Sequence, residues 1–308
     1  MAAANTHQSG ITDDIPPCSY YLLFSLDDAE HLPEALAVLE QTTDGQKVVL
    51  GVGKALFAKA GVNNIPFEAY QATGEQSKLV PAGAYDLALW LRERDEGVLF
   101  HRAKKIVAEL SPAFSLKECV RGITYLEKKE NDKQINHDLS GFEDGTENPE
   151  GDDKLIAAIV QNNNQILQGG SCWTLQKWQH QFDWLSSASQ GDKEKLIGRS
   201  LDDNREFKDN PSFAHVKRTA QESFSPEAFM WRRSMPWVND QLEGGLMFSC
   251  FARSFYPFSA QLNRMTGGED GVLDGLFQFS TVLFTCNFWC PPLVNGRVDL
   301  SFFLKGKL

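Results

Sequence analysis

The sequence lacks the features of a membrane or exported protein. Its 308 residues have a mean hydropathy of −0.33, and no apolar run approaches the roughly 20 residues that a spanning helix needs. Residues 1–17 contain neither a basic segment followed by an apolar one nor a pair of arginines, so they show no export signal. We therefore expect a cytoplasmic protein without membrane contact, with a disordered lead-in over residues 1–17.

Basic residues and paired cysteines are also scarce. The chain has 30 Lys and Arg against 41 Asp and Glu, a formal net charge of −11. Such a charge repels nucleic acid unless a local basic patch overrides it, so we expect no nucleic-acid partner. The six cysteines form no Cys-x-x-Cys pair, which favours reduced thiols over a disulfide framework. Cys286 and Cys290 are better explained as buried strand residues than as half of a metal site.

The pattern of apolar residues predicts the same order of strands and helices in both halves of the chain. In each half, apolar runs and alternating segments predict strands, and three-to-four-residue spacing predicts helices. In the first half we expect strands at 19–26, 47–53, 85–94 and 114–126 and helices at 29–41 and 97–110. In the second half we expect strands at 172–182, 230–237, 245–255 and 276–288 and helices at 189–197 and 258–265.

This order, βαββαβ in each half, predicts an α+β protein. Split β-α-β units of this kind form an antiparallel sheet with both helices on one face. We expect two ferredoxin-like domains, residues 18–140 and 141–308, paired like a dimeric α/β barrel. The two halves share no visible repeat of sequence.

Residues 141–149, GFEDGTENP, form a loop of unusual composition. The loop contains three carboxylates, two glycines, an amide and a proline, which is too few apolar residues for a core strand and too many turn formers for a helix. A tight loop of this kind can hold an acid in a fixed place, as an active-site base requires. The alternative is a solvated turn.

The loop resembles the Gly-x-x-Asp-Gly signature of the dye-decolorising peroxidases, which are haem enzymes with two ferredoxin-like domains. Further segments are similar to that family in the same order, and the absence of a long insertion resembles its shorter, cytoplasmic subgroup. The similar segments are Gly-Gly-Ser at 169–171, Ile-Gly-Arg at 197–199, SFAHVKR at 212–218, RRSMP at 232–236 and GGEDG at 267–271.

The resemblance implies one haem b per chain, with His215 as the axial ligand of the iron. The residue pattern alone does not rank His215 above His180 among the six histidines. A carboxylate on the other imidazole nitrogen would raise electron density at the metal. Asp274 is the candidate by resemblance, and Asp270 is the competitor. Lys217 and Arg218 are expected to meet a haem propionate, unless they are simply solvated.

On the opposite side of the cofactor, the resemblance implies Asp144 and Arg232 as the catalytic pair. Alternation along a strand at 230–237 puts Arg232 and Ser234 on one side and Arg233 on the other. We therefore expect Arg232 and Ser234 to contact the cofactor. Asn148 either holds a water molecule or positions the loop, and Glu143 and Glu147 are expected to face outwards. Phe248 is also assigned to the cofactor pocket.

These assignments predict a haem peroxidase that reduces hydrogen peroxide and oxidises dyes, phenolic compounds or porphyrinogens in one-electron steps. Asp144 would move a proton and Arg232 would stabilise negative charge. One alternative is a haem-handling protein that releases iron and has incidental peroxidase activity. Another, without haem, treats Glu143 and Asp144 as the acid pair of a hydrolase. By resemblance we also expect a homo-oligomer, a dimer or larger.

Overall fold

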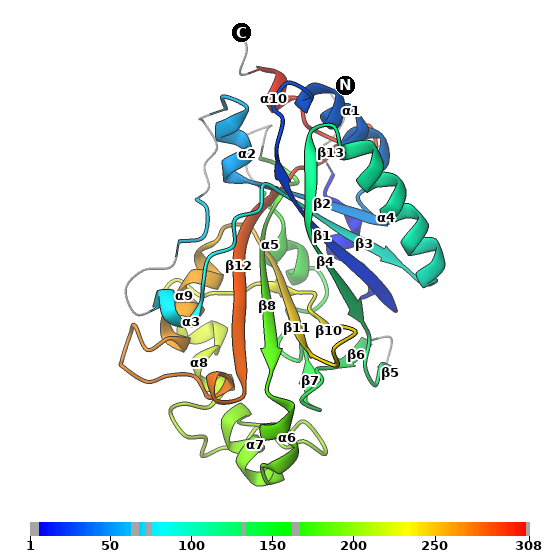
Figure 1. Cartoon of the computed structure of the whole chain (residues 1–308). Coiled ribbons are helices and arrows are strands. Elements are labelled where there is room, and N and C mark those ends of the chain that lie inside the picture. The colour runs from blue at the N-terminus through cyan, green and yellow to red at the C-terminus, as the bar shows by residue number, and fades with distance from the viewer. Residues whose placement is uncertain (1–5, 63–67, 72–75, 131–132, 162–166, 306–308) are drawn as a thin grey trace.

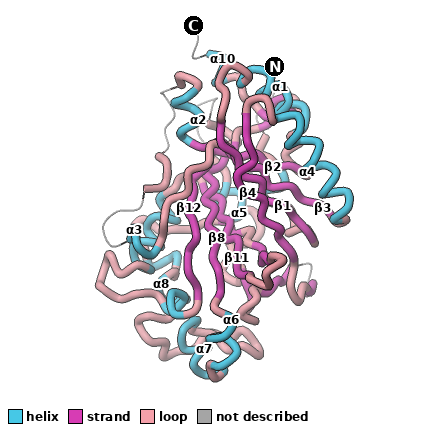
Figure 2. Tube along the Cα trace, viewed as in Figure 1, coloured by secondary structure: helices cyan, strands magenta, loops and turns pink. Residues whose placement is uncertain are grey.

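The computed structural model describes residues 6–62, 68–71, 76–130, 133–161 and 167–305, and its strands gather centrally with helices around them (Figures 1 and 2). Across these described ranges, no helix has the length and apolar character needed to cross a bilayer. The expected alternation of strands and helices in two halves is confirmed.

The first half is a four-stranded antiparallel sheet in the order β4-β1-β3-β2. Helix α4 contacts β1, β3 and β4 and also α1. It begins where the Asp95 carboxylate accepts a hydrogen bond from the Val98 N–H at 2.9 Å, a typical N-cap. It buries Leu99, Ala103 and Ile106 at helical spacing. The elements are β1 (Cys18–Leu26), α1 (Leu32–Thr42), β2 (Val48–Gly53), β3 (Leu87–Glu93), α4 (Glu96–Leu110) and β4 (Phe114–Ile123).

The second half repeats this arrangement with strands in the order β12-β8-β11, extended on the far side of β11 by β9 and β10. Helices α6 and α7 lie beyond the end of β8, at the bottom of Figure 1. The elements are β8 (Ser171–His180), α6 (Phe182–Ser187), α7 (Gln190–Ile197), β9 (Trp231–Arg232), β10 (Met235–Val238), β11 (Gly244–Ala252), α9 (Tyr256–Met265) and β12 (Ser280–Cys290).

The two sheets join at both edges, so the strands close into a barrel. Strand β12 pairs with β2 through Trp289 and Val52, and β10 pairs with β4 through Trp237 and Gly122. Closure leaves the inner faces of both halves packed against each other. Large aromatic side chains, including Trp90 and Trp173, fill this interior and are fully buried. The expected two ferredoxin-like halves and their barrel-like pairing are therefore confirmed.

The remaining described elements are short and connect or cover the barrel. Strand β7 carries Asp144, and α8 begins at His215. These elements are η1 (Ser9–Ile11), α2 (Lys54–Lys59), α3 (Gln76–Leu79), β5 (Lys128–Glu130), β6 (Lys133–His137), β7 (Glu143–Asp144), α5 (Asp153–Ala158), α8 (His215–Arg218), η2 (Gln221–Ser223), η3 (Gly275–Gln278), β13 (Leu293–Val294), β14 (Arg297–Val298) and α10 (Phe302–Lys305).

The expectation of a disordered lead-in is wrong for residues 6–17, whereas residues 1–5 lie outside the described part. The Gln8 side chain is buried, donates to the backbone oxygens of Leu50 and Pro291 at 3.0 Å and accepts from the Leu50 N–H at 2.8 Å. Ile11 is also buried. These contacts tie the segment to both halves, because Leu50 lies in the first and Pro291 in the second. A domain boundary near residue 140 stays a prediction.

Candidate active site

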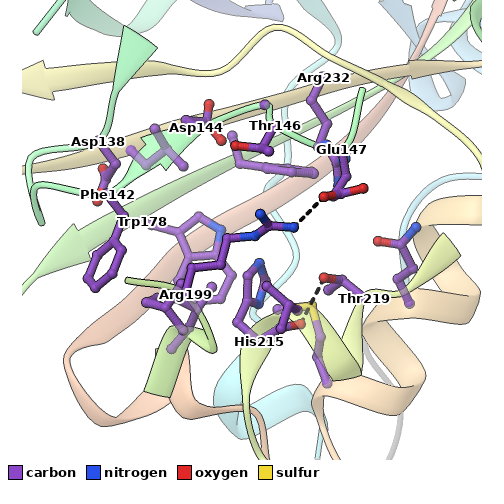
Figure 3. A pocket seen from close by; sticks show the side chains of 18 of the residues that line it. Asp138, Phe142, Asp144, Thr146, Glu147, Trp178, Arg199, His215, Thr219 and Arg232 are labelled. Carbon is purple, nitrogen blue, oxygen red and sulfur yellow. Dashed lines mark hydrogen bonds and ion pairs between the residues drawn. The ribbon is translucent and has the colours of Figure 1, made fainter. Parts of the chain in front are cut away.

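A cavity lies on the outer face of the second half. Residues of β8, β11, α8 and α9 line it together with the loop from Asp138 to Glu147. It contains about 1380 Å³ of non-protein space, counting the part that is open to solvent. His215 lies on one side of this space, and Asp144 and Arg232 lie on the other (Figure 3). The structure thus brings these three predicted residues to one cavity.

His215 begins the short helix α8, and Asp274 fixes its imidazole. Nδ1 of His215 lies 2.9 Å from Oδ2 of Asp274. The other oxygen of Asp274 accepts a hydrogen bond from the Leu276 N–H at 2.8 Å, capping η3. Asp274 is fully buried. Because a carboxylate accepts, Nδ1 carries the proton and the lone pair of Nε2 is left for a metal.

Asp270, the other candidate for the partner of His215, forms an ion pair with Arg218 instead. Its two oxygens accept from Nη1 and Nη2 of Arg218 at 2.6 and 2.7 Å. The hydrogen bonds from Arg218 hold the pKa of Asp270 at about 2. The partner of His215 is therefore Asp274, as the resemblance implied.

Lys217 and Arg218 were expected to meet a haem propionate, but neither lines the cavity. Arg218 is buried against Asp270, and Nζ of Lys217 donates to the backbone oxygen of Asn210 at 2.5 Å. Lys217 lies two positions after His215, so the turn of the helix points its side chain away from the cavity. Arg218 lies three positions after His215, and its side chain is held by Asp270 and by the backbone oxygen of Arg264.

Asp144 and Arg232 face each other without forming an ion pair. Among the described residues, no contact within 4.0 Å joins the carboxylate of Asp144 to the guanidinium of Arg232. Burial raises the pKa of Asp144, although the charge of Arg232 opposes this rise. Burial likewise lowers the pKa of Arg232, and Asp144 opposes that change. A carboxyl group and a cation can therefore both reach a third group placed between them.

The loop that carries Asp144 turns sharply directly after it. Gly145 has a φ of 77°, in the left-handed region that favours glycine. Asn148 does not line this cavity. Its side chain instead accepts from the Arg232 N–H at 2.8 Å and donates to the Arg232 backbone oxygen at 3.0 Å. Of the two expected roles, these hydrogen bonds favour positioning of the loop, and contact of Asn148 with a cofactor stays a prediction.

Ser234, which was also expected to contact the cofactor, is not among the residues that line the cavity. The argument from alternation assumed one strand over 230–237, but the strand is broken between β9 and β10 at Arg233 and Ser234. Ser234 is consequently buried, with its hydroxyl 3.4 Å from the Ser249 N–H. Arg233 points to a second cavity, stacked on Trp231.

Apolar side chains make up much of the remaining wall. Phe248 lines the cavity as expected, and Phe258 packs against it with ring centroids 6.2 Å apart. The other apolar lining residues are Phe142, Trp178, Ile197, Val216, Ala220, Met230, Leu246, Leu262, Met265, Leu276 and Phe279. Such a wall suits a flat apolar ligand.

Two groups at the cavity were not expected from the sequence. His180, for which only a surface position was considered, is buried, with Nε2 at 2.9 Å from Oδ1 of Asp138 and Nδ1 at 2.5 Å from Oγ of Ser280. Its position two residues after Trp178 on one strand, which puts both on the same face, was a signal for this.

Arg199 is the second residue at the cavity that was not expected from the sequence. It lines the cavity, donates to Glu147 and lies 2.9 Å from Glu206 (Figure 3). Glu147 is largely exposed, as expected, whereas Glu143 is only 20% exposed and accepts from Asn204 at 2.7 Å. Arg199 and Arg232 are the only cationic residues among those that line the described cavity.

Two ferredoxin-like halves closed into one barrel, with a carboxylate-bound imidazole opposite an acid and a guanidinium, define an α+β oxidoreductase with an apolar cofactor pocket. The model of the Dyp-type peroxidase C-terminal region matches residues 135–295, more than half of the chain. The chain belongs to the Dyp-type peroxidase family.

Individual relatives agree with this assignment. A dye-decolorizing peroxidase of Rhodococcus erythropolis is 28% identical over 255 residues, covering 80% of this chain and 72% of that protein. The fold is similar to that of a dye-decolorizing protein from V. cholerae, with a TM-score of 0.79, 22% identity and coverage of 94% and 97% of the two chains. A DypB variant of Rhodococcus jostii in complex with haem has a TM-score of 0.76 at 23% identity, covering 90% and 93%.

Proposed function

We propose that this protein is a haem b peroxidase that reduces hydrogen peroxide and oxidises small aromatic compounds or dyes. The single observation that carries the proposal is His215, whose Nδ1 is committed to Asp274 while Nε2 faces a cavity with Asp144 and Arg232 on its other wall. The family assignment and the relatives named for dye decolorisation support the same activity.

The residues of the cavity fit a haem. No group of three or more His, Cys, Asp or Glu able to hold a bare ion occurs in the described ranges. A single imidazole suits a metal whose other ligands come from a macrocycle. The apolar wall around Phe248 suits the macrocycle, and Arg199 offers a cation to its carboxylates. His215 would hold the iron, and a bound haem would supply the electrons that cleave the peroxide bond.

The residues of the chain would then carry the proton and the charge. Asp144, with a raised pKa, is suited to take a proton from one peroxide oxygen and deliver it to the other. Arg232 provides a fixed positive charge where negative charge develops on the departing oxygen. Asn148 holds the backbone of Arg232 and so fixes that charge relative to the acid.

The runner-up is a haem-handling protein that releases iron and has incidental peroxidase activity. It shares His215 and the apolar wall with the first proposal, but a carrier has no need of a buried acid opposite a guanidinium. The presence of Asp144 and Arg232 at the cavity favours the peroxidase.

Haem-loaded wild type, His215→Ala and Asp144→Asn test the proposal together. We expect His215→Ala to lose or change the ferric spectrum, because its iron ligand is gone. Asp144→Asn should keep the wild-type spectrum but oxidise a dye about 10²-fold more slowly, the scale typical of acid–base catalysis. An unaltered ferric spectrum in His215→Ala would refute the ligand assignment. Unaltered dye oxidation in Asp144→Asn, with iron release from haem, would favour the haem-handling protein.

The cellular context and assembly belong to the same proposal. We infer a cytoplasmic protein, divided into domains at about residue 140, that forms a homo-oligomer and binds neither nucleic acid nor membranes. Exposed apolar side chains on α4, Val98 at 49% and Phe100 at 50%, support a contact between copies. Light scattering of wild type and Phe100→Ser tests this, and a wild-type monomer at micromolar concentration would refute it.

A further inference from the structure

A second cavity lies behind the catalytic pair. Asp144, Gly145 and Arg232 line both cavities, and the second is otherwise lined by residues 12, 14, 15, 130, 134–136, 148–151, 154, 231 and 233. It contains about 1430 Å³ of non-protein space, counting the part open to solvent. The segment wrongly expected to be disordered thus forms one of its walls.

Arg233 is a buried cation in this wall without an anionic partner. It is 8% exposed, and its guanidinium makes no hydrogen bond or ion pair with any residue that the structure describes. The guanidinium lies over the ring of Trp231, whose centroid is 3.9 Å from Cζ. Burial lowers the pKa of Arg233 to about 10, so it remains charged at neutral pH. An uncompensated buried charge is costly, and its donors require an acceptor.

The acids that line this cavity are Asp14, Glu130, Asp144 and Glu150, and among the described residues none of their carboxylates lies within 4.0 Å of the guanidinium of Arg233. Asp14 is 2.7 Å from Nζ of Lys129, and Glu130 is 3.2 Å from Nζ of Lys128. Asp14 and Asp144 act on Arg233 only at longer range, as charges that favour its charged form.

A second cation lies on the same aromatic ring. Nζ of Lys154 is 5.9 Å from the centroid of Trp231, and Lys154 also lines the cavity. Two cations therefore lie next to one ring in this part of the wall.

We infer that the second cavity binds a small planar oxyanion, either a carboxylate or an inorganic ion such as nitrate, through the guanidinium of Arg233. The two N–H groups at one edge of a guanidinium match two oxygens of such an ion in a bidentate pair. Lys154 adds a second positive charge next to the ring of Trp231. The inference stands apart from the proposed peroxidase, because binding requires neither peroxide nor an electron donor.

Calorimetric titration of the haem-loaded protein with sodium nitrate, and separately with sodium acetate, tests the site. Ionic strength is held constant with a bulky sulfonate buffer, and the visible spectrum is followed so that ligation of the iron is recognised. We expect saturable binding of one ion per chain with an unchanged spectrum. Tighter binding of acetate identifies a carboxylate as the ligand, and tighter binding of nitrate an inorganic ion.

Variants assign the binding to Arg233. Arg233→Gln should weaken it by about 10- to 100-fold, the scale of a lost charged hydrogen bond. Arg233→Lys should retain part of the affinity, since it keeps the charge but not the planar fork, and this variant serves if Arg233→Gln does not fold. Arg205→Gln, at an exposed arginine outside both cavities, should bind as wild type does. The inference would be overturned if wild type showed no saturable binding, or if both Arg233 variants bound the ion as tightly as wild type does.

Discussion

The side-chain amide of Asn148 bonds to both backbone groups of Arg232. Oδ1 accepts from the Arg232 N–H at 2.8 Å, and Nδ2 donates to the Arg232 oxygen at 3.0 Å. The Asn148 N–H in turn donates to the oxygen of Gly145 at 3.1 Å, next to Asp144. One amide therefore joins the loop that carries the acid to the strand that carries the guanidinium.

Replacing this amide should reduce catalysis more than stability. Asn148→Ala removes two hydrogen bonds worth about 1 kcal/mol each, and we expect kcat/KM for peroxide to fall about tenfold as Arg232 loses its fixed position. Asn239→Ala is the matched control, because it also removes side-chain bonds from an exposed turn far from both cavities. Stopped-flow kinetics and thermal melts of both variants separate the two effects. Equal rates in Asn148→Ala and wild type would exclude a positioning role.

The buried acid should lower the stability of the protein at neutral pH. The pKa of Asp144 is raised above the ordinary value of 3.8. A carboxyl group of this kind contributes its full stability below its unfolded pKa and loses it as pH rises through the folded pKa. We expect Asp144→Asn to melt at a higher temperature than wild type at pH 7 and at nearly the same temperature at pH 4. A gain in melting temperature that does not depend on pH would contradict this assignment.

Asp138 should show the opposite dependence. Burial tends to raise its pKa, but His180 and Ser140 outweigh burial and hold the pKa below its ordinary value. Such a group contributes stability above its unfolded pKa and loses it as pH falls through the folded pKa. We expect Asp138→Asn to cost about 2 kcal/mol of unfolding free energy at pH 7 and much less at pH 3. The control is Asp240→Asn in an exposed turn, and a cost equal at both pH values would contradict the prediction.

Local pattern was sufficient for the architecture and insufficient for much of the site. The periodicity of apolar residues predicted the strands and helices. Each element of a ferredoxin-like half buries one face, and this burial repeats apolar residues at the period of the strand or the helix. The periodicity failed at Ser234, where the strand is interrupted for two residues. An interruption this short does not change the composition of the segment, so the sequence gives no sign of it. The pairing of His180 with Asp138 joins residues 42 positions apart, a contact that only the tertiary fold creates. His215 and Asp274 were identified by family resemblance and not by spacing.

The last prediction concerns Asp274, the partner of His215. Asp274→Asn keeps an oxygen that can accept from Nδ1 of the imidazole but removes the negative charge. The imidazole should then donate less electron density to a bound iron, and the reduction potential of the ferric form should rise. Potentiometric titration of the haem-loaded variant measures this directly.

Asp270→Asn is the matched control for Asp274→Asn. It removes the partner of the buried Arg218 and should lower the melting temperature, but it does not contact His215. Its reduction potential should therefore equal that of wild type. If Asp270→Asn shifted the potential as far as Asp274→Asn did, the shift would reflect general loosening of the segment, and Asp274 would have no specific effect on the ligand.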